Sequence, residues 1–318
     1  LDRHRHRRSL PGSPETGVVI GQAVADGFLT GAIIALGAIG VSLGLQILRF
    51  ANFSHAELLT WGAYLALSFT AFAGAGASIG PLSFGWQLLV AVLLAGISTG
   101  VVALIVDRLV YERLRARHAN TLTMVFASFG VALVLRNLVL LLWGPDAHYY
   151  TTELQIAVEV LPNVRMLPDQ IFILILAFVL VLALQLFLRL SRLGMAMRAM
   201  AESPALARVC GIEVNKVIRL TWMASGALAA AAGVFAGLTV QLRPEMGFNL
   251  LLSLFTAAIL GGAGSLIGGV VGGLAVGLAE NLSVLVIPAG YKQAMPFLLL
   301  LLVLVFRPQG LFGSPERS

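Results

Sequence analysis

Nine apolar runs divide this chain, and short polar segments separate them. The runs cover roughly residues 18–48, 54–73, 86–110, 122–142, 170–190, 217–240, 249–262, 265–287 and 293–306. A helix needs roughly 20 apolar residues to cross a bilayer, so most runs are long enough, whereas 249–262 is short or re-entrant. The runs lack period-two alternation, which excludes a transmembrane β-barrel. The pattern predicts an all-α fold, a polytopic transmembrane helical bundle of about eight or nine membrane segments whose first run is tilted or broken.

Composition agrees with this pattern. The 318 residues are 58% hydrophobic and 11% charged, whereas soluble domains average about 25% charged residues. A soluble enzyme, a nucleic-acid-binding protein and a disordered chain are therefore excluded. The basic pI, near 10.1, reflects arginines that separate the apolar runs, so these arginines read as topology signals. The single cysteine, Cys210, excludes an internal disulfide and a cysteine-rich metal site.

Arginine placement predicts the orientation, because cytoplasmic loops are rich in basic residues. Segments 111–121 and 191–216 lie among such residues and are predicted to be cytoplasmic, whereas 143–169 holds Arg165 among four acidic residues and is predicted to be outside. Arg307 places the C-terminal tail, 308–318, in the cytoplasm. Counting spans puts the flexible, arginine-rich tail 1–16 outside. Either that tail is tolerated there, or the first run hides an extra crossing of the single domain, 17–307.

A polar cluster interrupts the apolar pattern between the first two runs. Asn52, Ser54, His55 and Glu57 follow one run and open the next without a proper loop. Asn52 or Ser54 can cap the following helix, and the Glu57 carboxylate suits its positive end. The cluster is either a plain capped helix start at the cytoplasmic interface or a discontinuous helix pair that lines a pathway for a polar solute. Four other polar residues within runs read as packing residues: Asp26, Arg136, Asn137 and Glu280.

Glycines recur four residues apart in several of the runs. Gly27 and Gly31 lie in the first run, and Gly269, Gly273 and Gly277 lie in the run 265–287. Small residues at this spacing share one helix face and let two backbones approach closely. We expect these five glycines to pack helices together. The sequence leaves open whether these faces also slide during gating.

A second polar segment, 191–216, carries helix-end signals. Ser203 is a typical N-cap residue, Pro204 suits the first helical position, and Gly211 suits the C-terminal end. They frame a helix of about seven residues that is too short to be stable alone in water. It therefore docks either onto its own membrane domain or into a groove of a soluble partner.

Sequence patterns typical of catalysis are lacking. The chain has no G-x-x-x-x-G-K-[ST] phosphate loop and no H-E-x-x-H, so ATP-driven work needs another chain. Two G-x-S-x-G matches, around Ser78 and Ser98, lack the strand-to-helix context of a nucleophile elbow and are expected by chance among 34 glycines. We predict no catalytic residue and no metal site.

Four motifs resemble those of LivH-like membrane permease subunits of bacterial ABC importers for branched-chain amino acids. They are "FANFSHAE" (50–57), "SRLGMAMRAMAESPALARVCGI" (191–212), "AAILGGAGSLIGGVVGGLAVGLAE" (257–280) and "RPQGLFG" (307–313). The resemblance covers about residues 18–313. It departs from the family pattern at Ala56, where glycine is usual, and at Ser203 and Pro204, where an acidic pattern is usual. It implies that segment 191–216 is the coupling loop that contacts an ATPase, through Arg198, Ala201, Glu202, Pro204, Ala205, Leu206, Val209 and Gly211.

The resemblance also implies partners and a location. These are a second, similar permease subunit, two ATP-binding subunits that hold the ATP and Mg²⁺, a periplasmic substrate-binding protein and the lipid of a bacterial inner membrane. It implies no cofactor in this chain, no nucleic acid and no enzymatic reaction. The substrate would be a branched-chain or other hydrophobic amino acid. The alternatives left open are a permease for urea or short amides, and an ion-coupled secondary transporter or channel.

Overall fold

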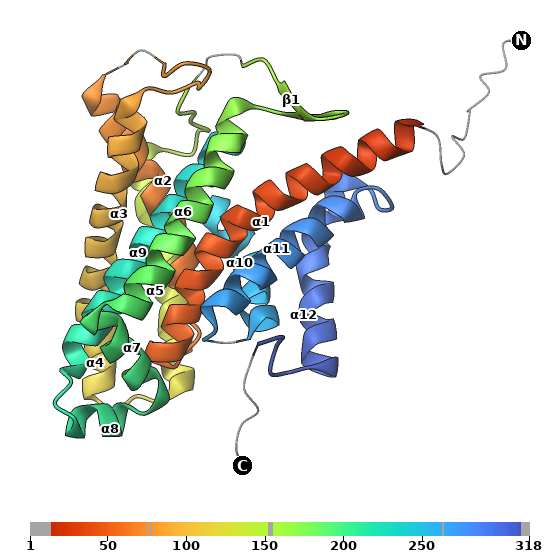
Figure 1. Ribbon diagram of the computed structural model, residues 1–318. Helices are drawn as coiled ribbons and strands as arrows, with labels where there is room; N and C mark the ends of the chain where they lie inside the picture. The colour runs from red at the N-terminus through yellow and green to blue at the C-terminus, as the bar shows by residue number, and fades with distance from the viewer. Residues whose placement is uncertain (1–13, 75, 77, 152–154, 263, 313–318) are drawn as a thin grey trace, which may run out of the picture.

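The computed structural model describes residues 14–74, 76, 78–151, 155–262 and 264–312, and it confirms the predicted helical membrane bundle (Figure 1). Seven helical stretches in the described part of the chain are long and apolar enough to cross a membrane, and α10 is a shorter apolar helix. The helices are α1 (Pro14–Leu48), α2 (Ser54–Ala73), α3 (Trp86–Val106), α4 (Glu112–Ala116), α5 (Thr121–Trp143), α6 (Pro168–Leu190), α7 (Arg192–Glu202), α8 (Pro204–Val209), α9 (Val214–Thr239), α10 (Met246–Gly261), α11 (Leu266–Ser283) and α12 (Met295–Phe306). A π-helical turn, η1 (Asp107–Tyr111), joins α3 to α4, and a 3-10 helix, η2 (Ala289–Ala294), precedes α12.

One small strand pair accompanies the helices of the bundle. Strands β1 (Val158–Leu161) and β2 (Val164–Met166) form a small antiparallel hairpin between α5 and α6. Its residues lie between the apolar runs 122–142 and 170–190. The hairpin contacts the start of α1, where Gln22 and Arg165 exchange two hydrogen bonds of 3.0 Å.

Helix α1 is one continuous helix of 35 residues that crosses the bundle obliquely (Figure 1). The first run is therefore tilted, and it hides no extra crossing. The helix begins at Pro14, within the predicted N-terminal tail of residues 1–16. Residues 1–13 of that tail lie outside the described residues.

The loops with contrasting charge lie at opposite ends of the bundle. Helices α4, α7 and α8 lie at one end and the hairpin lies at the other (Figure 1). Arg49, just after α1, donates a hydrogen bond of 3.4 Å to the carbonyl of Ala201 in α7. Segments 111–121 and 191–216 therefore share one end, which we call the α8 end. Segment 143–169 reaches the other, the hairpin end.

Close backbone contact joins α1 to α11. A Cβ placed on Gly31 would lie 2.8 Å from the Cα of Leu274, and one on Gly273 would lie 2.5 Å from the Cα of Ala35. A Cβ on Gly277 would collide with the backbone of Gly31. Gly27 and Gly269 face the same interface, against Leu278 and Ile39. Only glycine leaves room for such an approach.

Burial separates the central helices from the outer ones. Most of α1 and α9 is buried, whereas few residues of α5, α6 and α12 are buried and many of their large apolar side chains are exposed. In lipid such side chains need no protein cover. The outer helices therefore present the surface that lipid or another subunit covers.

Replacing Gly277 by alanine should lower the melting temperature of the purified chain. The added Cβ would meet the Gly31 backbone, and overpacking of this kind typically costs about 1–3 kcal/mol. The matched control is Gly130→Ala in α5, where a Cβ meets nothing within 4 Å. Thermal unfolding in detergent micelles, followed by tryptophan fluorescence, compares the two variants. Equal melting temperatures would show that α1 and α11 tolerate a wider separation.

Candidate functional site

The chain turns back into the bundle between α1 and α2. Arg49 adopts a left-handed conformation, with φ 59°. Helix α2 then begins beside the middle of α1. The His55 ring nitrogen Nε2 lies 3.1 Å from the carbonyl oxygen of Gly37 there. Ser54, His55 and Glu57 are buried there. The two helices are thus discontinuous, and the start of α2 is enclosed by protein.

Asn52 organises this buried helix start. Its side-chain oxygen accepts hydrogen bonds from the Ser54 backbone N–H (3.2 Å), the Ser54 hydroxyl (2.6 Å) and the Tyr111 hydroxyl (3.1 Å). Tyr111 belongs to η1, and its ring stacks on Trp222 of α9 with centroids 5.2 Å apart. Buried polar groups that are fully paired hold a unique arrangement. Asn52 therefore ties the start of α2 to η1, and through Tyr111 to α9.

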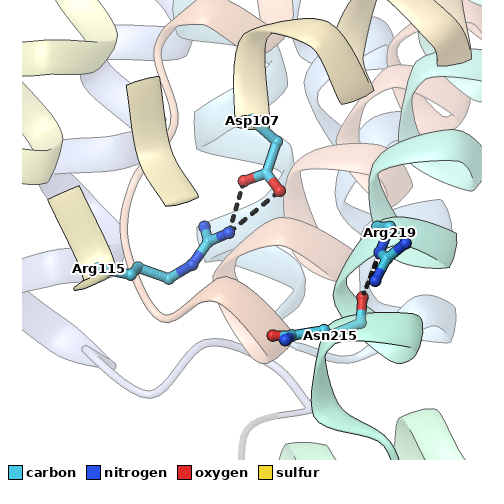
Figure 2. Close-up of polar contacts among 4 residues, drawn as sticks. All are labelled: Asp107, Arg115, Asn215 and Arg219. Carbon is cyan, nitrogen blue, oxygen red and sulfur yellow. Dashed lines mark hydrogen bonds and ion pairs between the residues drawn. The ribbon is translucent and has the colours of Figure 1, made fainter. Parts of the chain in front are cut away.

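The π-helical turn η1 begins at a buried carboxylate. Asp107 is 4% exposed, and Arg115 of α4 places one guanidinium nitrogen 2.8 Å from one carboxylate oxygen and 3.0 Å from the other. Figure 2 shows this pair next to α9, where Arg219 donates to the backbone carbonyl of Asn215 at 3.3 Å. An unpaired buried carboxylate would strongly destabilise the fold. The pair therefore fixes α4 against the end of α3.

Glu57 is the acid among the four predicted pathway residues, and it is buried. It is 2% exposed, and its Oε2 atom has no hydrogen-bond partner among the described residues. Arg136 of α5 lies close enough for charge attraction, and its guanidinium stands 5.3 Å from the centroid of the Phe248 ring. Among the cavities in the described part of the chain are five distinct ones, and none of these five is lined by Asn52, Ser54, His55 or Glu57. Their role in a pathway stays a prediction.

Segment 191–216 has the helix caps that its sequence predicts. The Ser203 hydroxyl accepts a hydrogen bond of 3.3 Å from the Leu206 N–H, Pro204 opens α8, and Gly211 has φ 82°. Ala207 is buried against the bundle, whereas Leu206 and Val209 are 66% and 86% exposed. One side of α8 thus docks on its own chain and the other is left free. Of the remaining predicted coupling residues, Arg198, Glu202, Ala205 and Gly211 are exposed, and Ala201 and Pro204 are half-buried.

The hairpin half of the bundle contains a cavity that sequence reasoning missed. Its volume is about 730 Å³, and α1, the end of α9, α10, α11 and η2 line it. The sequence offers one indication of this cavity. It is the stretch 240–245 between two apolar runs, which carries Arg243 and Glu245. Glu280, which the sequence suggested is a packing residue, lies in this lining. The described residues contain no group of three or more His, Cys, Asp or Glu placed to hold a metal ion.

Tyr150 anchors the hairpin-side loop next to this region. Its hydroxyl donates a hydrogen bond of 2.8 Å to the carbonyl of Ala63 in α2. Burial raises the pKa of the Tyr150 phenol well above its ordinary value, so the hydroxyl keeps its proton and remains a donor. The loop therefore packs firmly against α2.

Comparisons with known proteins agree over nearly the whole chain. The family model for the branched-chain amino acid transport system permease component matches residues 23–304. The chain is 34% identical to the high-affinity branched-chain amino acid transport system permease protein BraD of Pseudomonas aeruginosa and 33% identical to LivH of Escherichia coli, each over 93% of this chain and 96% of the relative. It is 26% identical to the probable branched-chain amino acid transport permease protein LivH of Methanocaldococcus jannaschii, over 76% of each chain. No solved structure matches.

These relatives cover the discontinuous helix pair, segment 191–216 and the cavity alike. The chain therefore belongs to the family of branched-chain amino acid transport system permease components.

Proposed function

We propose that this chain is the permease subunit of an ABC importer and forms half of a membrane pathway for branched-chain amino acids. The observation that carries the proposal is α8. It is a capped, anchored helix of six residues whose outward side chains, Leu206 and Val209, have no cover. Family membership and seven membrane-length helices support it. So does the lack of a phosphate loop in the sequence, which leaves ATP hydrolysis to another chain.

In this proposal the α8 end faces the cytoplasm of a bacterium, and two ATP-binding subunits dock there and hold the ATP and Mg²⁺. When they close on ATP, they push α8 and with it α7. The Arg49–Ala201 contact passes the movement to the end of α1, next to the turn that leads into Asn52, Ser54, His55 and Glu57. A second permease subunit completes the pathway, and a periplasmic binding protein delivers the substrate to the hairpin end. The chain forms and breaks no bond in the substrate.

The complete transporter should take up labelled leucine in an ATP-dependent manner. Proteoliposomes that contain the chain with its ATPase subunits, second permease subunit and binding protein provide the assay. Labelled urea, tested in parallel, addresses the alternative substrate class. Uptake of urea but not leucine would overturn the proposed substrate class. Uptake driven by a proton gradient without the ATPase subunits would overturn the proposed ABC mechanism.

Glu202→Arg should lower the amount of leucine taken up per ATP hydrolysed several-fold. The substitution reverses an exposed charge at the end of α7, next to α8, so the contact with the ATPase changes while the fold does not. The measurement is the ratio of leucine taken up to ATP hydrolysed in the same proteoliposomes. A ratio equal to that of the unaltered chain would contradict a coupling role for this residue.

Val209→Asp should weaken association with the ATPase subunits at least tenfold. It places a charge on the uncovered face of α8, where Val209 is 86% exposed. Val286→Asp is the matched control, because Val286 is 87% exposed and follows α11, away from α8. Titration of the detergent-solubilised permease with labelled ATPase subunit gives the two affinities. Similar losses in both variants would remove α8 as the docking element.

A further inference from the structure

The cavity in the hairpin half carries both signs of charge. Asp26, Glu245 and Glu280 bring carboxylates to its lining, and Arg243 and Lys292 bring cations. Arg243 and Glu245 lie 3.8 Å apart, with 53% and 35% of their side chains exposed. Their opposite charges therefore compensate each other close to solvent. Of the other three, Asp26 accepts a hydrogen bond of 3.2 Å from Gln22, and Glu280 and Lys292 face the same space as an acid and a base from α11 and η2.

Hydrogen bonds hold these two groups in place without using all of their capacity. The Ser253 hydroxyl donates to one carboxylate oxygen of Glu280 at 2.6 Å, which is the hydrogen bond that the described residues make to this carboxylate. Lys292 donates to the side-chain oxygen of Asn281 at 3.0 Å, and Asn281 in turn donates to Thr30 at 3.1 Å. An ammonium group has three donors, so Lys292 retains donors for a ligand. The pair thus offers one anionic acceptor and one cationic donor to the cavity.

An apolar groove continues from the same cavity. It has a volume of about 300 Å³ and is lined by the rings of Phe53, Phe248, Phe255 and Phe297 with Leu251 and Leu252. Asn249, Ser253 and Gln293 line both spaces. Phe53 stacks on Phe255 with centroids 4.9 Å apart. A ligand that bridges the junction therefore meets opposite charges on one side and aromatic rings on the other.

The backbone beside the cavity is irregular and lies deep in the bundle. Helix α9 ends at Thr239, and α10 begins at Met246. The N–H of Gly247 donates to the Thr60 hydroxyl at 3.0 Å, so α10 begins level with the first half of α2. Non-helical backbone at membrane depth occurs where it is buried in protein or lines a hydrated cavity, and in transporters such breaks mark binding sites.

We propose that this cavity and its groove bind a zwitterionic amino acid with an apolar side chain. Glu280 accepts hydrogen bonds from the ligand's ammonium group, and Lys292 donates to its carboxylate. The side chain enters the groove between Phe53, Phe248 and Phe297. The proposal rests on the proposed transport function and gives this subunit its own substrate site, whose charged part lies apart from Asn52, Ser54, His55 and Glu57 and whose groove is lined by the neighbouring Phe53.

Equilibrium binding to the assembled transporter in nanodiscs tests the site without ATP or binding protein. Tritiated leucine is the probe. Leucinamide lacks the carboxylate and 4-methylpentanoate lacks the ammonium group, and both should compete at least tenfold more weakly than leucine. Equal competition by all three compounds would overturn recognition of the two charges.

Two charge variants test which residue binds the ammonium group of leucine and which binds its carboxylate. Lys292→Met should weaken leucine binding at least tenfold and remove the preference for leucine over leucinamide. Glu280→Gln keeps an acceptor for Ser253 and should remove the preference for leucine over 4-methylpentanoate. Arg117→Met and Glu112→Gln are the matched controls, because both residues are exposed at the α8 end of the bundle. Both should bind leucine as the unaltered chain does, and a loss equal to that of the cavity variants would overturn the assignment.

Phe297→Ala tests the groove. Phe297 is 64% exposed, so its truncation leaves the bundle intact. It should weaken leucine binding several-fold and leave glycine binding unchanged. Unchanged leucine binding would overturn the side-chain assignment and leave the groove to lipid or to another subunit.

The wild-type transporter separates a failure of the site from a failure of the proposed function. If ATP-driven leucine uptake occurs and all cavity variants bind leucine like the wild type, the cavity proposal is overturned and the transport function stands. If the wild type neither binds nor transports leucine, the proposed function fails first. Gel filtration of each variant with its partners confirms that the complex is assembled.

Discussion

Inside a bilayer, water cannot satisfy the backbone, so each N–H and C=O needs a partner within the protein. This constraint explains why the chain is helical nearly throughout the membrane and why its breaks are so specific. Between α1 and α2, the side-chain oxygen of Asn52 accepts hydrogen bonds from the Ser54 N–H and from the Tyr111 hydroxyl. Where α9 gives way to α10, Thr60 takes up the N–H of Gly247. A side chain of the connecting segment satisfies the N–H group at the first break, and a side chain of another helix does so at the second.

Helix α1 connects the regions on which the proposed function depends. Its glycine face lies against α11, so the two backbones almost touch and Glu280 is brought to the cavity wall. Its hairpin half supplies Asp26 and Thr30 to the same cavity. Its other end leads through Arg49 to α7 and so to α8. Because the helix is continuous and closely packed, a movement at α8 has a rigid route toward the cavity.

The Asn52 side chain and the charged residues of the cavity differ in how fully their hydrogen-bonding capacity is used. In the Asn52 cluster the amide oxygen accepts three hydrogen bonds, and the surrounding side chains are buried. In the cavity, Glu280 and Lys292 face open space with part of their hydrogen-bonding capacity unused. A satisfied network makes the fold unique, whereas unused donors and acceptors in a cavity are suited to a ligand. The Asn52 side chain therefore holds the start of α2 in one arrangement, whereas the cavity is the proposed binding site.

The sequence by itself determined the helical membrane class, the approximate spans and the caps of α8, because these depend on local composition and on residues within a turn of each other. The charge pattern also predicted which loops share an end. Only the tertiary structure decided that Tyr111, 59 residues away, completes the Asn52 network, that α1 is one tilted helix, and that Glu280 lines a cavity. The hairpin and the π-helical turn were likewise not predicted. An apolar run shows that a helix is in the membrane, but its azimuth and neighbours arise from packing between distant segments, which no local pattern encodes.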